Sequence, residues 1–295
     1  RRILLETVSR LTATLPGFVD APEKLLANPD QELLLVITDG NRVGSIRWTL
    51  NAMLSSAEQS KELLSTDTMR VINDLRDELE ALDGALSGGL ASAPEEALDP
   101  LVTALVAMSG LMQESMVRGV GWRFMELGKR VERALQTITI LRSLMIPVTE
   151  ESDQSTLLTA LLTAMEVLIT YRRRNRRHRG IELGLELVML DPTNPRSLLF
   201  QIERLQQHLA ELPGADAMGS ELEEEERALL EAMTSLRLSR LDKLLVSQSG
   251  QRDDMDNLLQ QLADLLKEFN RFISDKHFDH RVDPQQLVTT FWGEQ

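Results

Sequence analysis

Apolar residues recur at steps of three and four along most of this chain, a spacing that places them on one face of an α-helix. The longest such stripe lies near the middle and includes Phe124, Leu127, Val131, Ala134 and Ile138. Similar spacings predict helices over residues 1–15, 30–37, 43–64, 65–82, 99–119, 121–145, 152–179, 181–190, 195–212, 221–247 and 252–278. Runs that alternate between apolar and polar residues are few. The pattern therefore predicts an all-α protein of about ten helices.

The two halves of the chain echo one another at one turn. In each half, a short apolar helix is followed by an aspartate, an asparagine and a serine before the next helix. These residues are Asp39, Asn41 and Ser45 in the first half and Asp191, Asn194 and Ser197 in the second. The Asp-to-Asn spacing differs by one residue, so both coincidence and internal duplication fit. We predict two similar bundle-like halves, residues 1–118 and 119–281, followed by a polar tail over residues 282–295.

Composition narrows the classes of function. The formal net charge of −14 opposes non-specific binding to nucleic acids or anionic membranes, because both need excess positive charge. The absence of cysteine excludes disulfides, thiolate metal sites and a cysteine nucleophile. No apolar run reaches the ~20 residues that span a bilayer, and no signal peptide is visible. We therefore expect a cytoplasmic protein without nucleic-acid or membrane partners.

One dense positive patch stands out in this acidic chain, over residues 171–179. Cations near a helix C-terminus are favoured by the helix dipole, which is a sufficient structural explanation for two or three of them. The remainder suggest an anion site for a phosphate, a carboxylate or an acidic partner surface, because the planar arginine fork matches such groups. Tyr171, Arg172, Arg173 and Arg176 are the binding candidates here.

The turn at residues 191–197 leads into another predicted helix. The sequence Asn194-Pro195 is typical of an N-cap followed by the first helical residue, so we predict that Asn194 caps a helix beginning at Pro195. Arg196 and Ser197 then lie beside free backbone N–H groups, where an anion can bind. Together with Asp191, they are candidates for an anion site, although a helix cap alone also explains this turn.

The central helix carries the remaining candidates. Glu126 precedes Arg130 by one turn, the favourable order for an ion pair. Glu132 shares a face with apolar residues and with Gly128, whose presence suggests that another backbone packs closely there. We predict that Glu132 is buried and that it pairs with Arg172 or Arg173 from another helix, since an unpaired buried charge is costly.

Metal and cofactor signatures are weak. The Glu-x-x-His pairs of di-iron bundles are absent, as are a phosphate-binding glycine loop and a nucleophile motif. Asp275, His277 and His280 lie close together near the chain end, but their spacing is unspecific. We expect no metal site and no cofactor in this chain.

Residues 122–134 resemble the signature of the bacterial alpha-E domain family, roughly Trp-x-Phe-x-x-Leu-Gly-Arg-x-x-Glu-Arg-Ala. The matching residues are Trp122, Phe124, Leu127, Gly128, Glu132, Arg133 and Ala134, while Lys129 replaces the usual arginine. Residues 65–73, 171–201 and 273–280 resemble further signatures of the family, the last of them including Phe278 and His280. The family normally carries an earlier copy of the Glu-Arg motif, which would precede Arg1.

The resemblance implies a helical domain of uncharacterised biochemistry. Family members are encoded beside, or fused to, ATP-grasp carboxylate–amine ligases and transglutaminase-like peptidases. We expect this chain to be the carboxy-terminal part of a fusion with a circularly permuted ATP-grasp ligase domain. ATP and magnesium would then be bound by that domain, and a transglutaminase-like peptidase is a further expected partner.

Three functions remain open at this point. The first is an accessory domain of a peptide- or amide-ligating system that binds an anionic substrate or partner. The second is a catalytic domain in which Glu132 acts as an acid or base beside Arg133, and the third is a scaffold without a small-molecule site. The binding candidates are Trp122, Glu126, Arg130, Tyr171, Arg172, Arg173, Arg176, Asp191, Asn194, Arg196, Ser197 and His280.

Overall fold

The computed structural model describes residues 1–90, 94–175, 180–213, 221–247 and 250–278. Within these ranges the chain is helical and forms no strand; Pro147 and Gln251 make an isolated antiparallel bridge. The all-α prediction is therefore confirmed. Arg176, His280 and the polar tail lie outside the described residues.

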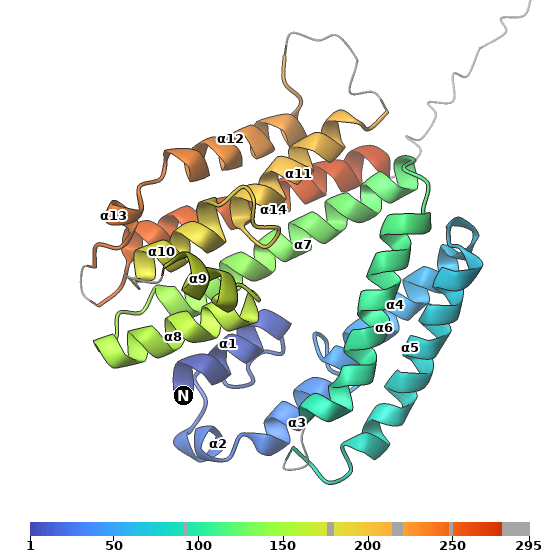
Figure 1. The fold of residues 1–295 in the computed structure, drawn as a ribbon, viewed down its shortest axis with the longest axis horizontal. Helices are drawn as coiled ribbons and strands as arrows, with labels where there is room; N and C mark the ends of the chain where they lie inside the picture. The colour runs from blue at the N-terminus through green and yellow to red at the C-terminus, as the bar shows by residue number, and fades with distance from the viewer. Residues whose placement is uncertain (91–93, 176–179, 214–220, 248–249, 279–295) are drawn as a thin grey trace, which may run out of the picture.

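The first half of the chain builds two groups of helices (Figure 1). A small N-terminal group precedes three longer helices that pack side by side. Their bounds are α1 Arg2–Thr12, α2 Glu23–Ala27, α3 Asp30–Thr38, α4 Ile46–Gln59, the 3₁₀ turn η1 Lys61–Leu63, α5 Thr66–Ala85 and α6 Pro94–Ser115.

The second half is larger and is built around its first helix. That helix, α7, is packed against α11, α14 and also α1. The bounds are α7 Val120–Met145, α8 Glu151–Ala164, α9 Leu168–Arg174, α10 Ile181–Leu185, the π-helical turn η2 Glu186–Leu190, α11 Leu198–Ala210, α12 Glu224–Leu238, α13 Leu241–Leu244 and α14 Asp253–His277.

Three helix boundaries differ from the sequence predictions. The helix predicted over residues 152–179 is interrupted between α8 and α9, where Glu166 adopts a positive φ of 55°. The helix predicted over residues 221–247 is divided at Ser239, whose backbone is extended. Pro100 lies inside α6 rather than at its start. The first two breaks carry no glycine or proline, so the local signals for a helix end are missing.

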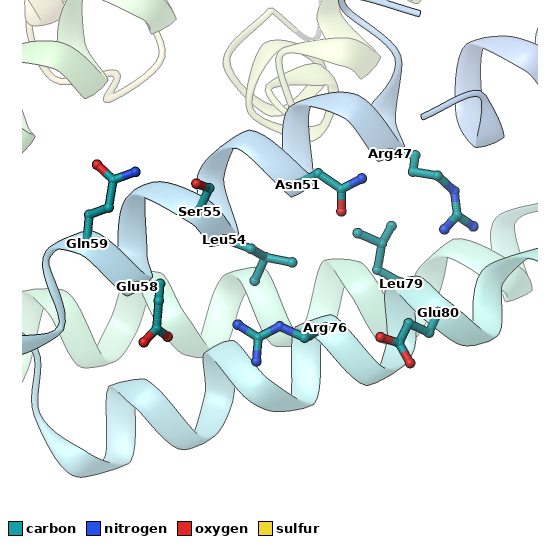
Figure 2. Close-up of a pocket in the computed structure, with 9 residues that line it drawn as sticks. All are labelled: Arg47, Asn51, Leu54, Ser55, Glu58, Gln59, Arg76, Leu79 and Glu80. Atoms are coloured by element: carbon teal, nitrogen blue, oxygen red, sulfur yellow. The ribbon is translucent and has the colours of Figure 1, made fainter. Parts of the chain in front are cut away.

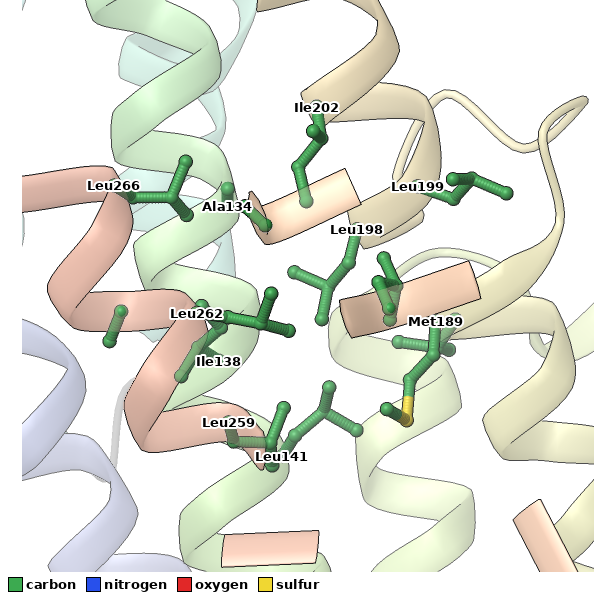
Figure 3. Packing of buried hydrophobic residues seen from close by; sticks show 14 of the residues in the cluster. Ala134, Ile138, Leu141, Met189, Leu198, Leu199, Ile202, Leu259, Leu262 and Leu266 are labelled. Carbon is green, nitrogen blue, oxygen red and sulfur yellow. The ribbon is translucent and has the colours of Figure 1, made fainter. Parts of the chain in front are cut away.

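The main hydrophobic core lies between α7 and the helices that follow it. Buried side chains of α7, α11 and α14 point toward one another in Figure 3, among them Leu141, Leu198 and Leu262. A separate cluster, with Ile72 and Leu75 at its centre, holds α4, α5 and α6 together. The helices that carry the candidate site, α7 and α11, therefore belong to the part of the fold with the larger hydrophobic core.

The similar turns of the two halves, residues 39–45 and 191–197, form the same structural unit. Asp39 and Asp191 have nearly the same backbone conformation, with φ of −77° in both and ψ of 102° and 109°. Six residues later, Ser45 and Ser197 each donate Oγ–H to the backbone oxygen of that aspartate, at 2.6 Å in both cases. Each serine also caps the following helix by accepting from the backbone N–H three residues on, at 3.0 and 3.1 Å. The spacing that the two turns share is therefore the six residues from aspartate to serine.

The predicted cap at Asn194 is wrong. Ser197 is the N-cap and α11 begins at Leu198, one turn later than expected. Asn194 instead folds the preceding loop: its Nδ2 donates to the Leu187 backbone oxygen at 2.7 Å, and its Oδ1 accepts from the Arg196 N–H at 3.0 Å. An asparagine side chain that bonds two residues ahead forms a local turn and leaves the cap to a later residue.

We predict that Ser197→Ala lowers the free energy of unfolding by about 1–2 kcal/mol, because it removes an N-cap. The same change also leaves the Asp191 backbone oxygen without the hydroxyl donor of a fully buried serine. Ser45→Ala should show a similar loss, since its contacts are the same. Urea unfolding measures both, with exposed Ser109→Ala on α6 as the control. If Ser197→Ala unfolds like the control, the serine does not hold this turn.

Candidate anion-binding site between two antiparallel helices

The candidate site lies where α7 and α11 pack against each other in opposite directions (Figure 1). On α7, Trp122, Glu126, Arg130 and Arg133 follow one another at steps of three or four residues, so they share one face. The register between the helices is fixed by polar contacts across them. Near the start of α7 these contacts reach the end of α11, and farther along α7 they reach its beginning.

Glu126 is the most deeply buried charge of this face, with 1% of its surface exposed. One carboxylate oxygen, Oε1, accepts from Gln113 Nε2 of α6 at 2.7 Å and also from Lys129. The other, Oε2, accepts from the Arg130 guanidinium at 2.7 Å. The predicted Glu126–Arg130 pair is therefore confirmed, and it belongs to a larger network that joins α6 and α7.

The pKa of Glu126 reflects two opposed effects. Burial raises it, but the hydrogen bond from Lys129 and the positive charges of Arg130 and Lys129 outweigh burial, so the pKa lies below its ordinary value. Glu126 is therefore ionised at neutral pH. Both of its carboxylate oxygens accept hydrogen bonds. Glu126 therefore acts as a fixed negative charge that holds Lys129 and Arg130 in place.

The start of α7 is anchored to the end of α11 through His208. Arg123 lies 3.2 Å from His208 Nδ1, and its guanidinium also pairs with Glu211. The Trp122 ring packs edge-on against the histidine, with 5.1 Å between ring centroids. Burial lowers the pKa of His208, and the charge of Arg123 lowers it further, against the opposing effect of Glu126. The imidazole is thus neutral at pH 7, and Nδ1 accepts from Arg123.

Arg133 has a different environment from the other arginines of this face. It is half-buried, yet in the part of the chain that the structure describes its guanidinium has no carboxylate or hydrogen-bond partner. Burial lowers its pKa, and so do the positive charges of Arg196 and Arg130 nearby, against the opposing negative charges of Glu126 and Glu166. Arg196 pairs with Glu166 at 2.8 Å, but that glutamate is 73% exposed. Arg133 is therefore near two other arginines, and no described carboxylate lies within ion-pair distance of its guanidinium.

Glu132 is not where the sequence predicted it. It is exposed, and among the described residues it pairs with neither Arg172 nor Arg173. The reason is the phase of α7, in which the buried residues on either side of Glu132 are Val131 and Ala134. Gly128 is exposed as well, and a side chain added there would meet nothing within 4 Å. No neighbouring backbone therefore packs closely at this point.

The arginine run and the 191–197 turn meet through one ion pair. Arg174, in the last turn of α9, contacts Asp191, whose carboxylate also accepts from the Thr193 N–H at 2.8 Å. Burial raises the pKa of Asp191, but the bonds from Thr193 and Arg174 lower it below its ordinary value overall. Arg196, in the same turn, lies near enough to Arg133 for its charge to lower the pKa of that arginine. The turn therefore connects the basic run to the central helix.

The remaining candidates of the run are spread out. Tyr171 is buried and donates its hydroxyl to the Gly180 backbone oxygen at 3.1 Å. Arg172 lines a pocket of about 490 Å³ beside α8 and α9, and Arg173 is exposed. In the described residues, no group of three or more histidine, aspartate or glutamate side chains is arranged to hold a metal ion.

Several residues of the network were missed by the sequence analysis, namely Gln113, Arg123, Gln201, His208 and Glu211. Gln201 Oε1 lies 3.4 Å from Arg130, and its Nε2 donates to the Pro195 backbone oxygen at 2.5 Å. Only one short-range pattern in the sequence points to any of these residues. Gln201 and His208 are seven residues apart and therefore lie on one face of α11. Their partners on α7 are more than 70 residues away in the chain.

A helical fold and the adjacent residues Glu132 and Arg133 on its central helix fit the description of an alpha-E domain. The model of the Alpha-E family, described as a predicted alpha-helical domain with a conserved ER motif, matches residues 2–278. The chain belongs to this family.

Curated relatives come from mycobacteria. The uncharacterized proteins Rv2567 of Mycobacterium tuberculosis H37Rv and Mb2597 of Mycobacterium bovis are each 31% identical to this chain over 255 residues. The matched segment covers 84% of this chain but 28% of each relative, so the chain spans less than a third of their length. No solved structure matches. Among the described residues, no helix has both the length and the apolar character needed to cross a bilayer.

Proposed function

We propose that this chain is an accessory domain of a peptide- or amide-ligating system and that it binds an anionic group of a substrate or partner at Arg133 and Arg196. One observation carries the proposal. Arg133 is half-buried beside two other arginines and has no anionic partner among the described residues. A guanidinium in such a place is held ready for a ligand that supplies the missing negative charge.

The charge balance of the face supports this reading. Its four cations are Lys129, Arg130, Arg133 and Arg196, and its two carboxylates are Glu126 and Glu166. Glu126 is committed to Lys129 and Arg130, and Glu166 to Arg196. The local surplus is positive in a chain whose net charge is −14. An anion is therefore attracted to this face and repelled by most of the remaining surface.

The nature of the ligand follows from the donors. Arginine forks bind carboxylates and phosphates through paired N–H donors, and here the donors stand on two different elements, the middle of α7 and the turn before α11. A ligand that bridges Arg133 and Arg196 would need two acceptor oxygens. A carboxylate of an acidic peptide has this form, and so does an acidic side chain on the surface of a partner domain.

The family membership supplies the wider setting of the proposal. The resemblance to alpha-E domains implies a link to ATP-grasp ligases and transglutaminase-like peptidases. On this basis we propose a circularly permuted ATP-grasp domain as the main partner. In that arrangement ATP and magnesium belong to the ligase. The helical domain would hold the acidic substrate or dock onto the ligase.

The two other functions explain less. As an acid or base, Glu132 would be an exposed carboxylate without a hydrogen-bonded neighbour to tune it, in contrast with the buried Glu126. A scaffold without a site would leave the unpaired, half-buried Arg133 unexplained. In our proposal the two residues of the Glu-Arg motif therefore have different roles: Arg133 binds the anionic group, and Glu132 faces solvent.

The proposal predicts that Arg133→Gln weakens binding of the acidic tripeptide Glu-Glu-Glu about tenfold or more, since a charge-assisted hydrogen bond is lost. Calorimetry at about 0.15 M salt would measure this, with Arg237→Gln as the control. Arg237 is exposed on α12 and pairs with Glu203. Equal affinity of wild type and Arg133→Gln, or no binding by wild type, would exclude the site.

A further inference from the structure

A second polar groove lies in the first half of the chain, between α4 and α5, away from the face that carries Arg133 (Figure 2). Its volume is about 440 Å³, within the range of small-molecule sites. Leu54 and Leu79, both buried, form its apolar floor. The charged side chains that line it are Arg47, Glu58, Arg76 and Glu80. The groove therefore offers charges of both signs over an apolar base.

Two of these charges already have partners. Arg47 pairs with Asp83 at 2.7 Å, and Glu58 pairs with Lys61 at 3.1 Å. Their charges are thus balanced within the protein. The remaining charged lining residues, Arg76 and Glu80, are therefore the candidates for recognition.

Arg76 and Glu80 remain unpaired although both stand on α5, one turn apart. The Arg76 guanidinium donates to the Asn73 side-chain oxygen at 2.9 Å, and no carboxylate of the described residues lies within ion-pair distance of it. Glu80 has neither an ion pair nor a hydrogen bond of its side chain in the described residues. Arginine before glutamate is the less favourable order for pairing along a helix, and these two side chains form no ion pair with each other.

We propose that this groove binds a zwitterionic peptide. Arg76 takes the terminal carboxylate, because its planar fork matches two carboxylate oxygens. Glu80 takes the terminal ammonium group. An apolar side chain of the peptide lies on Leu54 and Leu79, which gives the site its preference for apolar residues. The ligand class is a short peptide with both ends free, and this inference stands independently of the Arg133 site.

The dipeptide Leu-Leu is the probe, titrated into protein with labelled leucine methyl groups and followed by NMR. The expected result is saturable movement of the Leu54 and Leu79 signals. Arg76→Gln and Glu80→Gln should each weaken binding about tenfold. N-acetyl-Leu-Leu, which lacks the ammonium group, and Leu-Leu amide, which lacks the carboxylate, should bind as weakly to wild type as Leu-Leu binds to the matching variant.

The control variants lie on the same helix and outside the groove. Arg70→Gln removes an exposed arginine paired with Asp67, and Glu78→Gln removes an exposed glutamate. Both should bind Leu-Leu as wild type does. The proposal is overturned if wild type shows no saturable shift, if either groove variant binds Leu-Leu as tightly as wild type, or if the control variants are weakened as much as the groove variants. Circular dichroism at each step confirms that the variants are folded.

Discussion

Glu126→Gln is expected to lower the free energy of unfolding by about 3 kcal/mol, the range found when one member of a buried ion pair is removed. The substitution preserves the shape of the side chain. It leaves Lys129 and Arg130 without their counter-charge, and the amide nitrogen faces these donors in place of one carboxylate oxygen. Because Gln113 of α6 bonds the same carboxylate, the joint between α6 and α7 should weaken as well.

Chemical unfolding measures the effect, and Glu132→Gln is its matched control. Glu132 stands on the same helix but is exposed, so its substitution should change stability by no more than about 0.5 kcal/mol. The double variant Glu126→Gln, Arg130→Gln should recover part of the loss, because it removes one of the unbalanced cations. If Glu132→Gln is the more damaging of the two single changes, the burial assigned to Glu126 is wrong.

Acidification is expected to remove the same contribution. The folded pKa of Glu126 lies below the ordinary value of 4.5, so the unfolded chain takes up this proton first as the pH falls. The stabilisation is therefore complete above pH 4.5 and is lost progressively as the pH drops below 4.5 and through the folded pKa. The stability difference between wild type and Glu126→Gln should accordingly be greatest at neutral pH and shrink toward pH 3.

His208 also contributes to the loss of stability in acid. Its lowered pKa also makes the folded state less stable in acid, because a neutral buried imidazole must become charged. The histidine is present in both proteins, but the charge of Glu126 raises its pKa, so the difference between them reports Glu126 together with its effect on His208. A difference that is constant from pH 7 to pH 3 would mean that Glu126 does not titrate with folding.

The fold class could be predicted because helical spacing and composition are local properties. The same is true of the Glu126–Arg130 pair, whose partners are one turn apart. The phase of α7 was harder to predict. Glu132 has Met125 and Leu135 as helical neighbours, which suggested a buried face, but both are only partly buried, and the core contacts lie on the next positions around the helix. Only the packing of α11 and α14 decides which face is covered.

The candidate site was predicted in part. Arg133 and Arg196 were chosen for different reasons, one from the Glu-Arg motif and one from a helix start, and the structure brings their charges together. The contacts of Glu126 with Gln113 and His208 depend on α6 and α11, which no short-range pattern connects to α7. Similarly, Asn194 carried a valid capping signal, and Ser197 took the cap because its hydroxyl also bonds Asp191.

The central claim is that Arg133 and Arg196 together receive an anionic group. Its most direct test follows the side-chain Nε–H signals of arginine-labelled protein by NMR while Glu-Glu-Glu is added. We predict that the Arg133 and Arg196 signals shift together and saturate, while that of Arg240, an exposed arginine paired with Asp242, stays in place. An Arg133 signal that does not move, or an equal shift of all three arginines, would contradict the claim.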